Sequence, residues 1–120
     1  MKKILVADDE PDILKVVEFR LIKAGYEVIL TSNGKEALEQ FKKVKPDLVL
    51  LDYSMPIMNG DEVCIQIKAD PETQSIPVIF MTASTKIVAD QYIKKIGADD
   101  WVLKPFDPEI LLKKIKNLIG

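Results

Sequence analysis

The chain has 120 residues, of which 48% are hydrophobic and 30% are charged, and its formal net charge is −2. These values are typical of a single globular domain, so we predict one domain over residues 1–120. The acidic balance argues against direct nucleic-acid binding, and no apolar run approaches the ~20 residues that a membrane span needs. The single cysteine, Cys64, excludes an internal disulfide and a cysteine metal cage. Because the N-terminus lacks a signal-peptide pattern, we expect a cytoplasmic protein.

Short aliphatic runs alternate with amphipathic segments along the whole chain. The runs do not alternate polar with apolar residues, which is typical of strands buried on both faces of a parallel sheet. The predicted strands cover residues 4–7, 28–30, 48–51, 78–81 and 101–103.

A helical stripe of apolar residues follows each predicted strand. In chain order the stripes consist of Leu14, Val17, Leu21 and Ala24; Ala37, Leu38 and Phe41; Val63, Cys64 and Ile67; Ala89, Tyr92, Ile93 and Ile96; and Leu111, Leu112, Ile115 and Leu118. Gly25 and Gly97 follow the first and fourth stripes, where helices commonly end, and Pro108 suits the first turn of the last helix. This rhythm predicts an α/β fold, a doubly wound, five-stranded parallel sheet with five helices.

Polar side chains follow four of the five predicted strands. Asp8 and Asp9 follow the first strand, Asp52 the third, Thr82 the fourth and Lys104 the fifth. Because ligands of doubly wound sheets bind at the carboxyl ends of the strands, we expect these side chains to share one site. Taken singly, each also has a plain structural interpretation as a helix cap, a turn residue or a lysine at the rim.

The carboxylates predicted at this edge would repel one another. Two carboxylates ~4 Å apart repel each other by about 4 kcal/mol at an effective dielectric near 20, so their pKa values rise or a cation joins them. An all-oxygen cluster with access to water suits Mg²⁺, with Mn²⁺ as a second candidate. Lys104 and Thr82 would then hold phosphoryl oxygens. The residues therefore predict phosphoryl transfer to the Asp52 carboxylate.

These landmarks resemble the response-regulator receiver domain of two-component signalling over the whole chain. The resemblance rests on Asp8-Asp9, on the run DYSMPIMNG at 52–60, on Thr82-Ala83 and on Lys104-Pro105-Phe106. It implies a flavodoxin-like strand order, 2-1-3-4-5.

The resemblance also implies a metal site and a phosphoryl site. Asp9, Asp52 and the main-chain carbonyl of Ser54 would bind Mg²⁺ directly, whereas Asp8 would bind it largely through water. Asp52 would be the phospho-acceptor.

Further roles follow from the same resemblance. Thr82 would donate a hydrogen bond to the phosphoryl group, and Lys104 would neutralise its charge. The bond between Lys104 and Pro105 would be cis. Ser54 and Ser84 would flank the acceptor, and since neither is a good acid or base, we expect slow loss of the phosphoryl group.

Trp101 departs from the family pattern. Receivers usually have tyrosine or phenylalanine there, and that ring shifts inward as the threonine moves toward the phosphoryl group. An indole is larger than a phenol, so Trp101 is either the switch ring or a half-buried aromatic residue on an edge strand.

Several functional alternatives stay open. The phosphoryl source would be a sensor histidine kinase, a phosphotransfer protein or a small phosphodonor, and the output an effector domain or protein partner. A homodimer through the fourth helix, fifth strand and fifth helix is left open, and no membrane partner is expected.

A receiver-like scaffold that is not phosphorylated is the main rival to this function. An aspartyl-nucleophile phosphatase would need a second aspartate where Ser54 stands, so we do not expect a turnover enzyme. An FMN site is disfavoured because Asp8 and Asp9 repel a phosphate.

Overall fold

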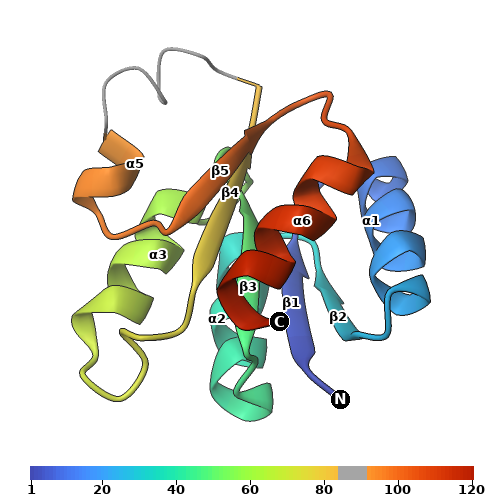
Figure 1. Cartoon of the computed structure of the whole chain (residues 1–120). Coiled ribbons are helices and arrows are strands. Elements are labelled where there is room, and N and C mark those ends of the chain that lie inside the picture. Colours follow the sequence, from blue (N-terminus) through green and yellow to red (C-terminus); the bar gives the residue numbers. More distant parts are fainter. Residues whose placement is uncertain (84–91) are drawn as a thin grey trace.

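The α/β architecture is confirmed by a computed structural model, which describes residues 1–83 and 92–120 (Figure 1). In chain order the elements are β1 (Lys3–Ala7), α1 (Pro11–Lys23), β2 (Glu27–Thr31), α2 (Gly34–Val44), β3 (Leu48–Asp52), α3 (Gly60–Ala69), β4 (Val78–Thr82), α5 (Tyr92–Lys95), β5 (Asp100–Leu103) and α6 (Pro108–Ile119). The strands form one parallel sheet in the order β2-β1-β3-β4-β5, as the resemblance implied.

All five predicted strands coincide with observed strands. The first, second, third and fifth predicted stripes lie on α1, α2, α3 and α6, except that Ala24 is the C-cap residue just after α1. The fourth stripe overlaps α5. Ala89 of that stripe lies outside the described residues. Within those residues, no helix combines the length and the hydropathy that a membrane span would need.

The sheet separates two hydrophobic cores. One core lies between the sheet and helices α2, α3 and α5, and the other lies between the sheet and helices α1 and α6 (Figure 1). Successive strand residues point to opposite cores, so that Leu5 and Val49 face α2 and α3 whereas Ile4 and Leu48 face α1 and α6. This burial on both faces explains why the strands read as continuous aliphatic runs.

The parallel arrangement gathers the strand ends at one edge of the sheet. In register, Asp52 at the end of β3 lies beside Met81 of β4, and Thr82 at the end of β4 lies beside Leu103 of β5. The first polar residues after the aliphatic runs are therefore brought together by backbone pairing alone.

Candidate functional site

The polar residues predicted at the strand ends do meet at one place. They line a cavity of about 530 Å³ whose walls are Asp9, Glu10, Asp52, Ser54, Thr82, Ala83 and Lys104. Asp8 lies beside this cavity, and its side chain has no exposed surface. Ser84, the other predicted flanking residue, lies outside the described residues.

The Lys104 ammonium is the centre of the charge arrangement. Its Nζ lies 2.8 Å from Oδ2 of Asp8, 3.1 Å from Oε1 of Glu10 and 3.4 Å from Oδ2 of Asp52. The lysine side chain is 11% exposed. One cation thus contacts carboxylates that come from the ends of two different strands.

Asp8 is held from two sides. Its Oδ1 accepts a hydrogen bond from the main-chain N–H of Glu10 at 2.9 Å, and its own N–H donates to the carbonyl of Thr31 at 3.1 Å. With the Lys104 ammonium on Oδ2, both oxygens of this buried carboxylate have partners, which such burial requires.

The pKa of Asp52 is raised from 3.8 to about 7. Burial is the largest cause and the charge of Asp8 the second, while Lys104 acts in the opposite direction. Burial by itself would lower the pKa of Lys104, but its hydrogen bond to Asp8 and the charge of Asp52 outweigh burial, so the pKa of Lys104 is raised. Lys104 therefore stays an ammonium at neutral pH, whereas the ionised form of the Asp52 carboxyl is disfavoured.

The acidic residues of the site fit a hard divalent cation. Oxygens of Asp8, Asp9, Glu10 and Asp52 all lie within 4.8 Å of one another. Among the described residues, one ammonium faces these four carboxylates, so the cluster keeps an excess of negative charge. Carboxylate oxygens beside a cavity with room for water are the donor set that Mg²⁺ prefers.

Gly60 shapes the loop behind Asp52. Its N–H donates to the carbonyl of Tyr53 at 2.9 Å, and a Cβ atom on Gly60 would collide with the main-chain oxygen of Asp52. The carboxamide of Asn59 accepts from the N–H of Met55, which closes the same loop. Ile57 lies at the loop tip with a positive φ of 70°, an uncommon conformation for a β-branched residue.

The backbone after β5 directs Lys104 toward the cavity. The N–H of Lys104 donates to the carbonyl of Thr82 at 2.8 Å, so the strand pairing continues to the lysine itself. The Lys104–Pro105 bond is cis, as the resemblance implied. The Thr82 side chain is buried at the same edge of the sheet.

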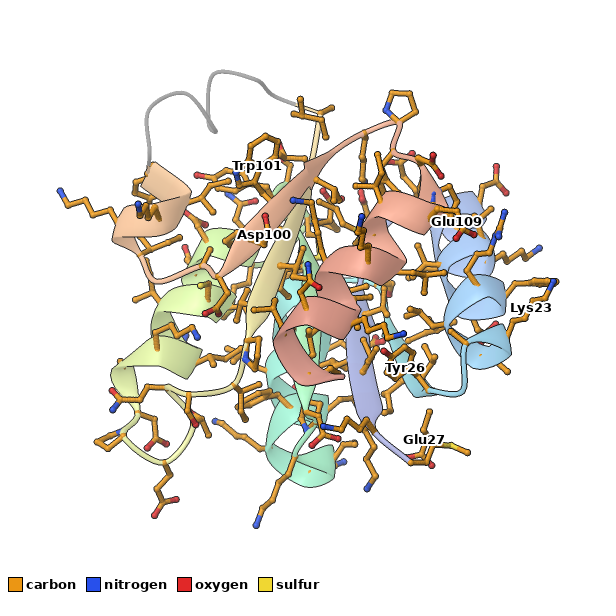
Figure 2. The ribbon with its side chains drawn as sticks, in the orientation of Figure 1. Lys23, Tyr26, Glu27, Asp100, Trp101 and Glu109 are labelled. Carbon is orange, nitrogen blue, oxygen red and sulfur yellow. The ribbon has the colours of Figure 1, made fainter. Side chains whose placement is uncertain are left out.

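Trp101 lies on the edge strand and is 37% exposed (Figure 2). The Nζ of Lys114 lies 5.7 Å from the centre of the Trp101 ring, and the same ammonium lies 2.9 Å from Oδ1 of Asp100. This position is that of a partly exposed edge-strand aromatic residue bound to a cation. A role as switch ring stays a prediction.

Glu10 also belongs to this site, although the sequence pattern does not single it out. Acids are common at helix N-termini, so the pattern at this position favours a helix cap. Glu10 does occupy the N-cap position of α1, yet in the described structure its side chain makes no capping hydrogen bond and contacts Lys104 instead. No local sequence pattern distinguishes these two orientations.

A second cavity has a similar volume but different chemistry. It measures about 520 Å³ and lies between α2 and α3, over the apolar side chains of Leu38, Phe41, Ile67 and Ile76. Lysines line one side and acids the other, without the convergent acids and ammonium of the strand-end cavity. The strand-end cavity is therefore the candidate functional site.

Comparisons with known proteins agree with this geometry. The sequence profile of the response regulator receiver domain matches residues 4–116. The probable transcriptional regulator ycf27 of Pyropia yezoensis is 42% identical over 118 residues, which cover 98% of this chain and 47% of that protein. The chain thus spans about half the length of the curated relatives it matches.

Two solved structures cover the whole fold. Chemotaxis response regulator CheY4 of Vibrio cholerae is 35% identical with a TM-score of 0.91, and the match covers 98% of both chains. Response regulator TrrA of Thermotoga maritima, solved in complex with Mg²⁺-BeF, is 37% identical with a TM-score of 0.89. That match covers 98% of this chain and 99% of TrrA.

Proposed function

Since this chain belongs to the response regulator receiver domain family of two-component signalling, we propose that its Asp52 carboxylate accepts a phosphoryl group. The donor would be a sensor histidine kinase, a phosphotransfer protein or a small phosphodonor. The observation that carries the proposal is the position of Asp52, a nearly buried carboxylate that lies at a strand end, 3.4 Å from the Lys104 ammonium and among three further acids.

The chemical step is a displacement at phosphorus. An Asp52 carboxylate oxygen forms a bond to phosphorus, and the bond from phosphorus to the donor nitrogen or oxygen breaks, with its electron pair leaving on the donor. Lys104 stabilises negative charge on the phosphoryl oxygens, and the Thr82 hydroxyl donates to one of them. The pKa of Asp52 is raised first by burial and second by the charge of Asp8, and the positive charge of a bound cation would oppose both effects.

The acid cluster fits Mg²⁺, with Mn²⁺ as the alternative. We assign Asp9, Asp52 and the main-chain carbonyl of Ser54 as direct ligands and Asp8 as a ligand through water. When bound, the ion neutralises charge on the carboxylates and on the phosphoryl group. The presence of Mg²⁺-BeF in the TrrA structure supports the choice of ion.

Phosphorylation would shift the domain between two states that differ in surface shape. In this proposal Thr82 moves toward the phosphoryl group and Trp101 senses that movement. Ser54 offers no acid or base to activate water, so the phosphorylated form should decay slowly and the domain should not act as a turnover enzyme. Ser84 would have the same neutral role.

Output would pass to an effector domain or a protein partner. The curated relatives include transcriptional regulators about twice as long as this chain, so an effector domain in the same protein is one form of output. Residues 1–120 would be the receiver domain, without nucleic-acid contacts of its own. A homodimer through α5, β5 and α6 and a cytoplasmic location stay predictions.

The test is the intact mass of the protein after incubation with acetyl phosphate or phosphoramidate, with and without Mg²⁺. We expect one phosphoryl adduct that needs Mg²⁺ and that hydroxylamine removes. Asp52→Asn is the matched control, since it keeps the size of the side chain and removes the nucleophile. If a folded protein that binds Mg²⁺ forms no adduct, the better interpretation is a receiver-like scaffold that is not phosphorylated.

A further inference from the structure

We propose that Glu10 is a positioning residue that competes with the phosphoryl group for the Lys104 ammonium, an inference that rests on the proposed phosphorylation of Asp52. In the structure Oε1 of Glu10 lies 3.1 Å from Nζ of Lys104. The contact joins the N-terminus of α1 to the segment that follows β5.

Glu10 occupies one of the few donors of the Lys104 ammonium. An ammonium carries three N–H donors. Two of them make hydrogen bonds, to Asp8 at 2.8 Å and to Glu10 at 3.1 Å, and the ammonium also lies 3.4 Å from Oδ2 of Asp52. A phosphoryl group on Asp52 therefore shares this ammonium with Asp8 and Glu10 and competes with them for its donors.

Of the three carboxylates, Glu10 is the one most easily displaced. Asp8 is fully buried and is also fixed by the N–H of Glu10, and Asp52 is joined to the phosphoryl group itself. The Glu10 side chain is 59% exposed, so its carboxylate can turn into water without leaving a buried charge unpaired.

The orientation of Glu10 is independent support. Glu10 holds the N-cap position of α1, where a side chain commonly accepts from the first N–H groups of the helix. In the described structure it makes no such bond and contacts the lysine. Glu10 thus holds the Lys104 ammonium in its present position in the unphosphorylated form. This contact opposes binding of the ammonium to the phosphoryl oxygens.

The test compares the rate of phosphoryl transfer in four proteins, the unsubstituted chain and three variants. Each is measured at saturating Mg²⁺, and the saturating concentration is determined separately for each protein. Glu10→Gln removes the charge and the ion pair. Glu10→Asp keeps the charge but shortens the side chain by one methylene, so that the contact is lost. Asp12→Asn removes a charge from the same helix turn at an exposed position that is not among the lysine's described partners.

We expect both Glu10 variants to form the adduct about twofold to fivefold faster than the unsubstituted chain, the range that a partly exposed ion pair supplies. Asp12→Asn should match the unsubstituted chain. The gain should persist at high phosphoramidate concentration, because it arises after the donor has bound.

Three results would overturn the inference while leaving the proposed function intact. They are unchanged rates in both Glu10 variants, slower rates in either of them, or acceleration by Glu10→Gln and Asp12→Asn alike with none by Glu10→Asp. The last pattern would mean that general repulsion of an anionic donor is responsible. If the unsubstituted chain forms no adduct at all, both the inference and the proposed function are wrong.

Discussion

The Lys104 ammonium lies 2.8 Å from Oδ2 of Asp8, a carboxylate with no exposed surface. The two residues follow β1 and β5, which are not neighbours in the sheet, so their ion pair crosses the strand-end edge. A buried charge without its partner is costly, and this pair therefore connects the stability of the domain with its chemistry.

Replacing Lys104 by alanine should lower the free energy of unfolding by about 3 kcal/mol at pH 7 without Mg²⁺. This is the low end of what breaking a buried ion pair costs, because the lysine keeps some access to water. Urea unfolding of both proteins checks the value. Added Mg²⁺ should restore part of the loss, since the ion supplies the missing positive charge.

Lys114→Ala is the matched control for this variant. Lys114 pairs with Asp100 at 2.9 Å, but both side chains are partly exposed, so the loss should stay within about 1 kcal/mol. Equal losses in the two variants would contradict the special cost assigned to the Asp8–Lys104 pair.

The raised pKa of Asp52 predicts a stability that falls as pH rises. The folded protein keeps the Asp52 proton up to about pH 7, whereas the ordinary value is 3.8. Between these two values the native state binds more protons than the unfolded state, so the free energy of unfolding decreases with increasing pH. Asp52→Asn removes this contribution.

Thermal unfolding of both proteins from pH 4 to pH 8, without Mg²⁺, checks the sign. The advantage of Asp52→Asn should be smallest near pH 4, grow through the window and level off above pH 7, where it should reach a few kcal/mol. Saturating Mg²⁺ should reduce this difference. Parallel stability curves for the two proteins would mean that the pKa of Asp52 is not raised.

The fold could be predicted from the sequence because burial on both faces leaves a simple pattern. The aliphatic runs of β1, β3 and β4 and the polar residue after each one are properties of consecutive residues. Parallel strand pairing by itself then places Asp52 and Thr82 at the same edge of the sheet. The strand order came from the family resemblance, since alternation of strands and helices alone allows other orders.

The details of the site depend on contacts between distant residues, which local sequence does not encode. Asp8 and Asp9 are adjacent acids, yet Asp8 is fully buried and Asp9 is exposed. Glu10 contacts Lys104 although its position is that of a helix cap. Asp8 bonds to Thr31 and Lys104, and Glu10 contacts Lys104, so these arrangements depend on strands that meet only in the assembled sheet.

Cys64 should be unreactive in the folded protein. Burial raises the pKa of its thiol to about 12, and its Sγ lies 3.7 Å from the carbonyl oxygen of Ile96. Because the thiolate is the nucleophile, a disulfide reagent at pH 8 should label the native protein far more slowly than the protein in denaturant. Rapid labelling without denaturant would mean that α3 opens frequently.

Gly60→Ala should impair both stability and phosphoryl transfer. The new Cβ would collide with the main-chain oxygen of Asp52, so the loop must shift and carry the acceptor with it. Overpacking of this kind costs about 1–3 kcal/mol. A displaced carboxylate should also slow adduct formation, because the nucleophile is no longer aligned with the donor.

Gly25→Ala separates these two effects. Gly25 has a φ of +97° and nothing near the position of its Cβ, so alanine there should cost about 1–2 kcal/mol of backbone strain and leave the acceptor in place. Urea unfolding should show a loss in both variants, whereas intact-mass kinetics should show slower phosphorylation in Gly60→Ala alone. A Gly60→Ala protein that is phosphorylated at the unsubstituted rate would show that the loop can absorb a methyl group without moving Asp52.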